Sequence, residues 1–258
     1  MLDNYEAFKQ QVYTLTGIDL SAYKERQMKR RIDALIQKNG VKSYPDYVNL
    51  LKTDKVKFEE FVNYLTINVS EFYRNPEQWD TLEKEILPYL FGKFGKNLKI
   101  WSAACSTGDE PYSLVMLLSK HIPLEQIDIY ATDIDKQILA KAKVGLYNEK
   151  SIAGVPKDLR VKYFDKIGSA YQIKSCIKER VHFEQQNLLS DKYPTDFHFI
   201  VCRNVLIYFT EEAKDEIYRK FYRALKKEGM LFIGSTEQIV NYRDMGYLRK
   251  NSFFYEKG

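Results

Sequence analysis

The 258-residue sequence has few cysteines, few histidines and no long apolar run. Because no stretch of 18 apolar residues occurs, we expect no transmembrane helix. The first six residues include two acidic and no basic side chains, which argues against a secretory signal peptide. The three histidines follow no ligand spacing, so we predict no metal site. The cysteines are far apart and are expected to be buried free thiols in a reducing cytoplasm: Cys105, Cys176 and Cys202.

Charge of one sign is only slightly in excess. Forty basic and 35 acidic side chains give a formal net charge of +5, which does not by itself indicate nucleic-acid binding. The hydrophobic content of 45% is sufficient for a packed core. The length allows one large domain, or a medium domain with a small one.

The first 75 residues are predicted to be helical, because apolar side chains recur there at helical spacing. The expected helices cover about 5–15, 22–37, 44–51 and 55–65. From about residue 76 the pattern changes to alternating strands and helices, which is typical of a mostly parallel sheet with helices on both faces.

The second predicted helix carries a concentration of basic side chains. Its apolar face consists of Met28, Ile32, Leu35 and Ile36. Arg26 and Arg30 lie on the opposite stripe, and Lys29 and Arg31 flank it. Two interpretations remain open: a solvated helix face, which charge alone favours, or a docking surface for an acidic partner.

The segment from Leu98 to Leu118 reads as a buried strand, a turn of small residues and a helix. This arrangement holds nucleotide-like ligands in doubly wound α/β domains. The turn lacks the glycine and lysine spacing of phosphate-binding loops, and Asp109 and Glu110 would repel a pyrophosphate. The two carboxylates suit a cationic ligand such as S-adenosylmethionine, although an ordinary strand–helix turn is the alternative.

Polar residues follow three further predicted strands. Asp133 closes the next predicted strand after the turn, and a carboxylate there can accept bonds from ribose hydroxyls. The alternative role for Asp133 is a helix N-cap. Asn187 and Asn204 suit an adenine edge or an amino-acid group, or they are turn formers. Tyr208 lies just beyond a strand end, where core packing is its alternative role.

An unusually long connection, of more than thirty residues, lies between the predicted helix that ends at residue 147 and the predicted strand that begins at residue 181. We predict a helix over 157–163 and a strand over 170–177, which could pair with 180–185 as a small antiparallel hairpin. The insertion is expected to be either a structural flap or an edge that binds a partner.

Four segments in order resemble one known family, the bacterial chemotaxis-receptor glutamate O-methyltransferases (the CheR family). They are Phe61–Asn68 continuing to Arg74, Trp101–Ser113, Ala131–Asp135 and Cys202–Phe209. The resemblance implies a helical N-terminal receptor-recognition domain with a linker (1–75). It also implies a class I (Rossmann-like) α/β S-adenosylmethionine methyltransferase domain (76–258) with an antiparallel β-subdomain inserted at about 148–180.

The resemblance also implies which residues contact S-adenosylmethionine and its product S-adenosylhomocysteine. It assigns them to the linker, to the turn and to the ends of the strands: Asn68, Ser70, Arg74, Glu110, Asp133, Asn187, Leu188, Asn204 and Val205. Arg74 and Tyr208 are our candidates for shaping the acceptor pocket. No general base is expected, because a glutamate with a pKa of about 4.3 is already an anion at pH 7.

The implied partners are the acidic cytoplasmic methylation helices of chemoreceptors. This favours the docking interpretation for Arg26, Lys29, Arg30 and Arg31. We expect a cytoplasmic monomer that is recruited to receptor clusters, without membrane insertion and without nucleic acid. The short hairpin near residues 166–169 argues against binding of a receptor's C-terminal tail. The alternatives are a nucleic-acid methyltransferase, for which no base-flipping motif appears, and a cofactor-binding module without catalysis.

Overall fold

The computed structural model describes residues 4–258; residues 1–3, with which the expected helical domain begins, lie outside the described part. The chain forms two compact units. The first comprises the chain up to Asn68 together with Leu206–Glu216, and the second comprises Val69–Val205 and Ile217–Gly258. Within the described residues, no helix combines the length and the apolar character needed to cross a membrane.

The first unit is helical, as the spacing of apolar residues predicts. A short 3₁₀ turn (η1, Leu20–Ala22) precedes the second helix, which therefore begins three residues later than expected. Its predicted apolar face is buried. Aromatic rings fill the core, with the centroid of Phe8 lying 4.6 Å from that of Tyr44. The helices are α1 (Tyr5–Thr16), α2 (Glu25–Lys38), α3 (Tyr44–Thr53) and α4 (Lys55–Thr66).

A segment distant in sequence completes this unit. It contains the 3₁₀ turn η4 (Leu206–Tyr208) and the first residues of α11 (Glu211–Ala224). Tyr23 and Phe209 form an antiparallel bridge, and their rings stack with centroids 4.5 Å apart. The backbone N–H of Lys24 donates to the carbonyl of Tyr208 at 2.9 Å. These contacts attach the segment to the beginning of α2.

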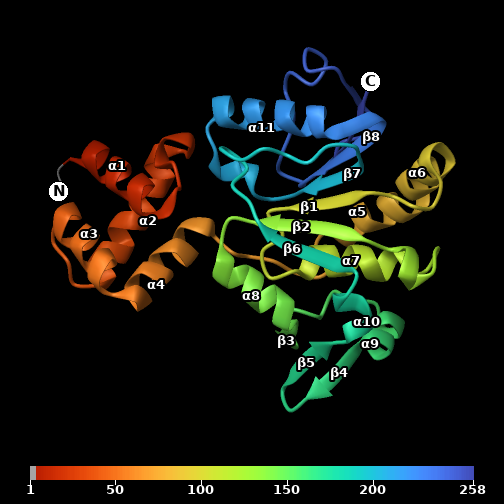
Figure 1. The fold of residues 1–258 in the computed structure, drawn as a ribbon, viewed down its shortest axis with the longest axis horizontal. Helices are drawn as coiled ribbons and strands as arrows, with labels where there is room; N and C mark the ends of the chain where they lie inside the picture. Colours follow the sequence, from red (N-terminus) through yellow and green to blue (C-terminus); the bar gives the residue numbers. More distant parts are fainter. Residues whose placement is uncertain (1–3) are drawn as a thin grey trace. The chain divides into compact units, whose positions relative to one another are not determined.

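The second unit contains a seven-stranded sheet in the order β6-β2-β1-β7-β8-β10-β9 (Figure 1). The first five strands in that order are parallel, whereas β10 pairs antiparallel with both β8 and β9. The strands are β1 (Ile100–Ala103), β2 (Ile129–Asp133), β6 (Val181–Gln185), β7 (Phe197–Cys202), β8 (Leu225–Ile233), β9 (Tyr247–Arg249) and β10 (Phe254–Lys257). The C-terminal part of the chain thus adds two strands, β9 and β10, which pair antiparallel with each other.

Helices cover both faces of this sheet, as predicted (Figure 1). On one face, Trp101 of β1 contacts Phe221 of α11, with ring centroids 5.3 Å apart. On the other, Trp79 of α5 lies against Phe232 of β8 at 6.5 Å. The helices are α5 (Pro76–Thr81), the π-helical η2 (Leu82–Ile86), α6 (Leu87–Phe94), α7 (Asp109–Leu118), the short η3 (Leu124–Gln126) and α8 (Lys136–Val144).

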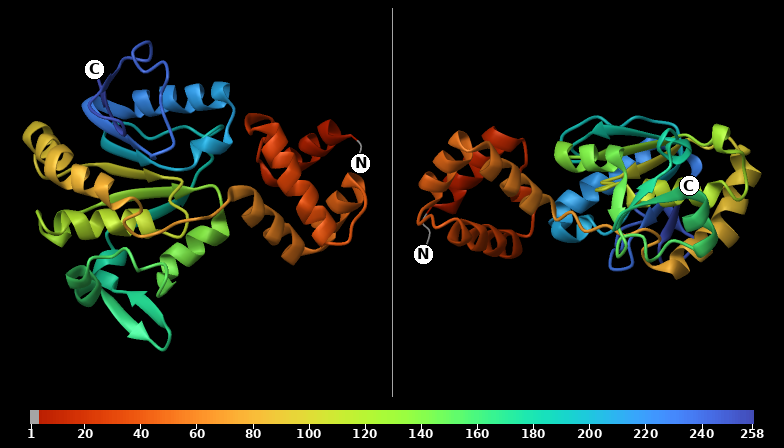
Figure 2. Two further views of the ribbon diagram at one scale, coloured as in Figure 1. Left: turned by 180° about the vertical axis from the view of Figure 1, so that it is seen from behind. Right: turned by 90° about the horizontal axis from the view of Figure 1, so that it is seen from below.

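The inserted subdomain is a three-stranded antiparallel sheet in the order β3-β5-β4. It lies apart from the main sheet, as the left view of Figure 2 shows in green. Its elements are β3 (Leu146–Asn148), α9 (Lys157–Tyr163), β4 (Phe164–Ile167), β5 (Ala170–Ile173) and α10 (Ser175–Lys178). The prediction of a strand over 170–177 was therefore wrong at its end. The pairing with 180–185 was also wrong, because β6 is instead parallel to β2 and buries Val181 in the main sheet.

The cysteine prediction was correct for two of the three side chains. Cys105 and Cys202 are buried free thiols, whereas Cys176 is free but exposed. The error at Cys176 follows from the secondary structure, since this residue lies in α10 rather than on the buried face of a strand.

Candidate functional site

The strand order brings the predicted polar residues to one edge of the sheet. β1 lies between β2 and β7. The strands that follow β1 in sequence are added first on one side of it, as β2 and β6, and then on the other side, as β7 and β8, so the strand order switches at β1. In open α/β sheets, ligands bind outside the carboxyl ends of the strands at such a switch point. The ends of β6, β2, β1 and β7 lead to Asn187, Asp133, Ala104 and Asn204 respectively.

Asp133 is held as a buried hydrogen-bond acceptor at the end of β2. Its Oδ2 accepts the backbone N–H of Ser106 at 2.9 Å, and its Oδ1 accepts that of Asp135 at 3.0 Å. Burial raises the pKa of Asp133 to about 6. Asp135, not Asp133, caps α8, because its side chain accepts from Gln137 and Ile138. The alternative role of Asp133 as the helix cap is therefore excluded.

The turn after β1 has a strained backbone. Ala104 and Ser106 have φ angles of 57° and 49°, which side-chain-bearing residues rarely adopt. Gly108 has φ of 86°, and a Cβ there would lie 3.0 Å from the ring of Tyr112 and 3.1 Å from Ala142. Within the described residues, the buried Oγ of Ser106 has no hydrogen-bond partner. Such strain is characteristic of ligand-binding turns.

Glu110 lies in the first turn of α7, close to the end of β1. Its Oε1 accepts the hydroxyl of Ser102 at 2.8 Å, and its Oε2 lies 3.6 Å from Nη1 of Arg203. Burial raises the pKa of Glu110, while the guanidinium of Arg203 opposes this shift.

Arg203 is a site residue for which we predicted no role. Its Nη2 donates to the carbonyl of Arg74 and to Oε1 of Gln78, both at 2.7 Å. Its guanidinium also lies over the ring of Phe232, 4.6 Å from the centroid. Arg203 thus fixes the end of the linker and the first turn of α5 to the end of β7. The arginine directly after a predicted strand, followed by asparagine, was the available signal.

The linker residues Ser70 and Arg74 reach the same part of the second unit. The hydroxyl of Ser70 is hydrogen-bonded to the buried carboxyl of Asp109, which also pairs with Thr107. The guanidinium of Arg74 forms no ion pair with any residue from 4 onward. Its charge lowers the pKa of Arg203, although burial of Arg203 is the larger cause.

Asn204 and Val205 are held by a buried glutamate that the sequence did not indicate. Oε2 of Glu237 accepts the backbone N–H of Asn204 at 2.9 Å, and Oε1 accepts that of Val205 at 3.1 Å. Asn204 has a φ angle of 59°. Its Oδ1 is buried without a hydrogen-bond partner in the described chain. An unpartnered buried acceptor of this kind points to a ligand donor.

Asn187 and Leu188 follow β6, where a turn holds both. Oδ1 of Asn187 accepts the backbone N–H of Leu189 at 3.0 Å, and its own N–H donates to Asp191 at 2.8 Å. Asn187 is therefore a turn former, one of its two expected roles. Leu188 is buried, and its carbonyl accepts the hydroxyl of Tyr193 at 2.7 Å.

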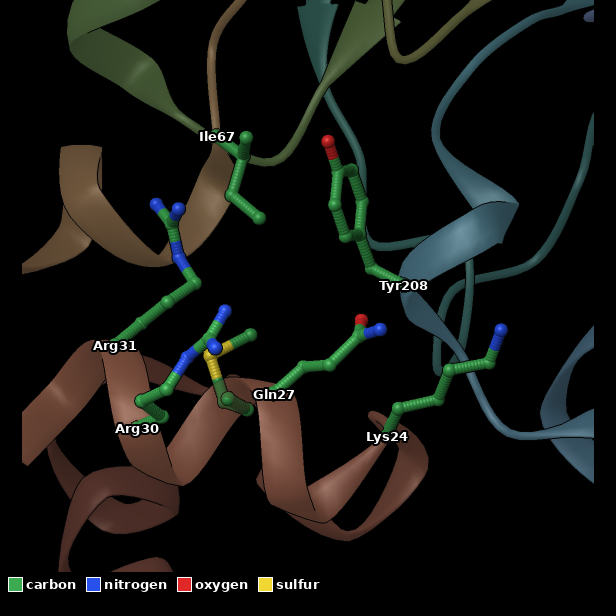
Figure 3. A pocket seen from close by; sticks show the side chains of 7 residues that line it. Lys24, Gln27, Arg30, Arg31, Ile67 and Tyr208 are labelled. Carbon is green, nitrogen blue, oxygen red and sulfur yellow. The ribbon is translucent and has the colours of Figure 1, made fainter. Parts of the chain in front are cut away.

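Asn68 and Tyr208 belong to the first unit. The amide of Asn68 donates to Thr66 Oγ1 at 2.9 Å. Tyr208 lines a pocket on α2, where its ring and Ile67 face the basic side chains (Figure 3). The side chain of Tyr208 is partly buried at this pocket. The pocket is lined by Lys24, Gln27, Met28, Arg30, Arg31, Ile67 and Tyr208.

The four basic residues of the α2 stripe differ in their surroundings. Lys29 pairs with Asp33 at 2.9 Å. Arg31 lies over the ring of Tyr64 and donates to its carbonyl at 2.8 Å. Arg26 and Arg30 are exposed, and neither has an ion-pair partner in the described part of the chain. These two arginines are the charges that remain available for an external partner.

Comparison with known proteins agrees with this geometry. Residues 68–253 match the family described as CheR methyltransferase, SAM binding domain, and residues 3–66 match CheR methyltransferase, all-alpha domain. The chain is 42% identical to a chemotaxis protein methyltransferase of Listeria monocytogenes over 98% of this chain and 97% of the relative. It is 34% identical to one of Borreliella burgdorferi over 92% and 88%.

Among solved structures, the fold resembles a TehB-like SAM-dependent methyltransferase from Corynebacterium glutamicum. The two share 16% identity, with a TM-score of 0.40 over 70% of this chain and 93% of that chain. The family matches together cover nearly the whole sequence. The chain therefore belongs to the CheR family of S-adenosylmethionine-dependent methyltransferases.

Proposed function

We propose that this protein methylates glutamate side chains of chemotaxis receptors, giving glutamate methyl esters and S-adenosylhomocysteine for sensory adaptation. The observation that carries the proposal is 42% identity, over 98% of the chain, to a relative named chemotaxis protein methyltransferase. The acceptor itself, a glutamate on a cytoplasmic receptor helix, rests on the family resemblance of the four sequence segments.

The residues at the strand ends fit S-adenosylmethionine. The cofactor carries a sulfonium, an ammonium and ribose hydroxyls, and it has no phosphate. The buried carboxylate of Asp133 suits the ribose hydroxyls, and the partly buried carboxylate of Glu110 suits the ammonium. Ser106 Oγ and Asn204 Oδ1 are buried without partners in the described residues, so a bound ligand would satisfy them. The remaining proposed contacts are Asn68, Ser70, Arg74, Asn187, Leu188 and Val205.

The protein's task in the reaction is mainly alignment. The bound cofactor supplies an electrophilic methyl group on its sulfonium. The acceptor glutamate is already an anion at neutral pH, so no side chain has to remove a proton. Holding the two reactants in line can supply roughly 7–11 kcal/mol of the barrier. We assign this alignment to Arg74, whose guanidinium has no ion pair within residues 4–258, and to Tyr208.

Receptor recognition is assigned to the basic stripe on α2. Methylation regions of receptors are acidic helices, and Arg26 and Arg30 present exposed charges that no described residue neutralises. The groove beside them is also lined by Lys29 and Gln37. Arg31 borders the pocket that contains Tyr208. Charge complementarity of this kind increases the rate of encounter and selects the partner.

We further propose that the enzyme acts as a cytoplasmic monomer recruited to receptor clusters. The proposed division of labour is recognition by residues 1–75 and methyl transfer by residues 76–258. The turn between β4 and β5 comprises only Gly168 and Ser169, which supports a β-subdomain that does not bind a receptor tail.

The deciding experiment mixes the purified protein with tritium-methyl S-adenosylmethionine and membranes that carry chemoreceptors. Base-labile label on receptor glutamates is the expected result, and an Asp133→Ala protein is the control that should transfer none. Label on added nucleic acid would instead establish a nucleic-acid methyltransferase. Tight S-adenosylhomocysteine binding without label on any acceptor would favour a binding module.

A further inference from the structure

Glu237 is a buried carboxylate that receives three backbone N–H groups from two neighbouring strand ends. Asn204 and Val205 donate from the end of β7, and Gly234 donates from the end of β8 at 2.7 Å. Only 7% of the Glu237 residue is exposed. Burying a carboxylate costs free energy unless such donors compensate it. A carboxylate at this position therefore calls for a functional explanation.

Two of the three hydrogen bonds, from the N–H groups of Asn204 and Val205, hold the backbone at Asn204. Its φ of 59° is in the left-handed region, which few residues other than glycine and asparagine adopt. The approach is close, because a Cβ on Gly234 would lie 2.7 Å from the backbone nitrogen of Asn204 and 2.9 Å from its Nδ2. The side-chain Oδ1 of Asn204 is left buried without a partner from the described chain.

We propose that Glu237 is a positioning residue that holds the Asn204 carboxamide in the orientation in which it contacts S-adenosylmethionine. The inference rests on the proposed contact between Asn204 and the cofactor. Glu237 acts through the backbone of Asn204 and need not touch the ligand itself.

A carboxylate is required because both of its oxygens accept. Glutamine has a single acceptor oxygen, and its NH₂ group would face a backbone N–H. A Glu237→Gln protein should therefore lose at least one charge-assisted bond, and the Asn204 backbone should relax toward a negative φ. We expect its affinity for S-adenosylhomocysteine to fall about tenfold or more, since a hydrogen bond to a charged group is lost.

A double-mutant cycle separates positioning from general stability. S-adenosylhomocysteine dissociation constants are measured by calorimetry for the wild type, Glu237→Gln, Asn204→Ala and the double variant. If Glu237 acts through Asn204, the double variant should bind about as weakly as Asn204→Ala alone. If the double variant instead lost affinity by the product of the two single-variant factors, the inference would be overturned. Unimpaired binding by Asn204→Ala would instead refute the proposed role of Asn204.

Glu256→Gln is the matched control. Glu256 is also a buried acid of the same sheet, where it pairs with Lys250 and lies beside Met230, away from the strand ends. The Glu256→Gln change should lower Tm without changing the affinity for S-adenosylhomocysteine. An equal loss of affinity in both variants would contradict a specific role for Glu237.

Should Glu237→Gln fail to fold, two further measurements still test the inference. Glu237→Asp keeps the charge but shortens the side chain, so it should fold and bind with intermediate affinity. In the unmodified protein, the backbone amide protons of Asn204, Val205 and Gly234 should be shifted downfield and protected from exchange. Fast exchange of these amides, or unchanged binding by Glu237→Asp, would overturn the inference.

Discussion

Asp133 shows how one carboxylate can combine structural and ligand-binding demands. Its two oxygens each accept a backbone N–H, from Ser106 and from Asp135, and these bonds position the carboxylate at the end of β2. Each carboxylate oxygen has a second lone pair that remains available for a hydroxyl donor. The burial that strengthens such bonds also raises the pKa of Asp133 to about 6.

This pKa predicts a pH dependence of cofactor binding. At pH 7.5 the Asp133 carboxyl is ionised, and it becomes protonated as the pH falls below about 6. A protonated carboxyl accepts hydroxyl bonds less well, so S-adenosylhomocysteine affinity should fall up to about tenfold per pH unit below that value.

Calorimetry between pH 7.5 and 5 measures this effect, with Asp133→Asn as the control. The carboxamide does not titrate. The Asp133→Asn protein should therefore bind S-adenosylhomocysteine weakly, and its affinity should lack the Asp133 contribution to the pH dependence. Identical pH profiles for the two proteins would show that Asp133 does not contact the ribose as an anion.

At the level of elements, the strand–turn–helix over β1 and α7 depends on a close approach of several side chains. Gly108 sits among Tyr112, Ala142 and Phe183 with a positive φ. A change to alanine introduces both backbone strain and a steric clash, which together cost of order 1–3 kcal/mol.

We therefore expect Gly108→Ala to lower the free energy of unfolding by that amount and to weaken cofactor binding. The matched variant is Gly92→Ala in α6, where a Cβ would meet no atom within 4 Å and φ is not positive. This control should stabilise the protein slightly, because alanine favours a helix over glycine. Chemical denaturation measures the free energy of unfolding of both variants. Equal values for Gly108→Ala and Gly92→Ala would contradict the steric argument.

The helix α2 presents its charges in a way that allows a clean test of receptor recognition. Reversing Arg26 and Arg30 to glutamate should raise the KM for receptor at least about tenfold, because repulsion replaces attraction. Cofactor affinity should stay unchanged, since neither residue lies at the strand ends.

The control changes two exposed lysines elsewhere in the same unit, Lys42 and Lys52, to glutamate and thus makes the same change in net charge. Receptor methylation kinetics at low salt compare the two proteins. An equal effect of both double variants would assign the result to net charge rather than to the α2 stripe.

At the scale of the whole molecule, the net charge of +5 is small, but its local concentration on α2 makes a distinct prediction. Raising the salt concentration from about 0.05 to 0.5 M shortens the screening length to well below 10 Å. The KM for receptor should rise accordingly, while the dissociation constant of S-adenosylhomocysteine should change little. A KM that does not respond to salt would remove electrostatic docking from the proposal.

The sequence by itself determined the alternation of elements, the buried face of α2 and the polar residues at the strand ends. These follow from local periodicity, because a helix or strand that buries one face repeats its apolar residues at 3.6 or 2.0 positions. Asp133, Glu110 and Asn204 could be singled out as candidates because each lies beside a recognisable break in such a pattern.

The tertiary structure alone decided which distant residues support them. Nothing in the local pattern indicates that Glu237 meets the N–H groups of Asn204, that Arg203 meets the carbonyl of Arg74, or that residues 206–216 join the helices of the first unit. The pairing of β6 with β2 was missed for the same reason. Such contacts depend on which strands become neighbours in the sheet. The free energy of burying the surfaces that these strands share selects the strand order, and no single residue's preference does so.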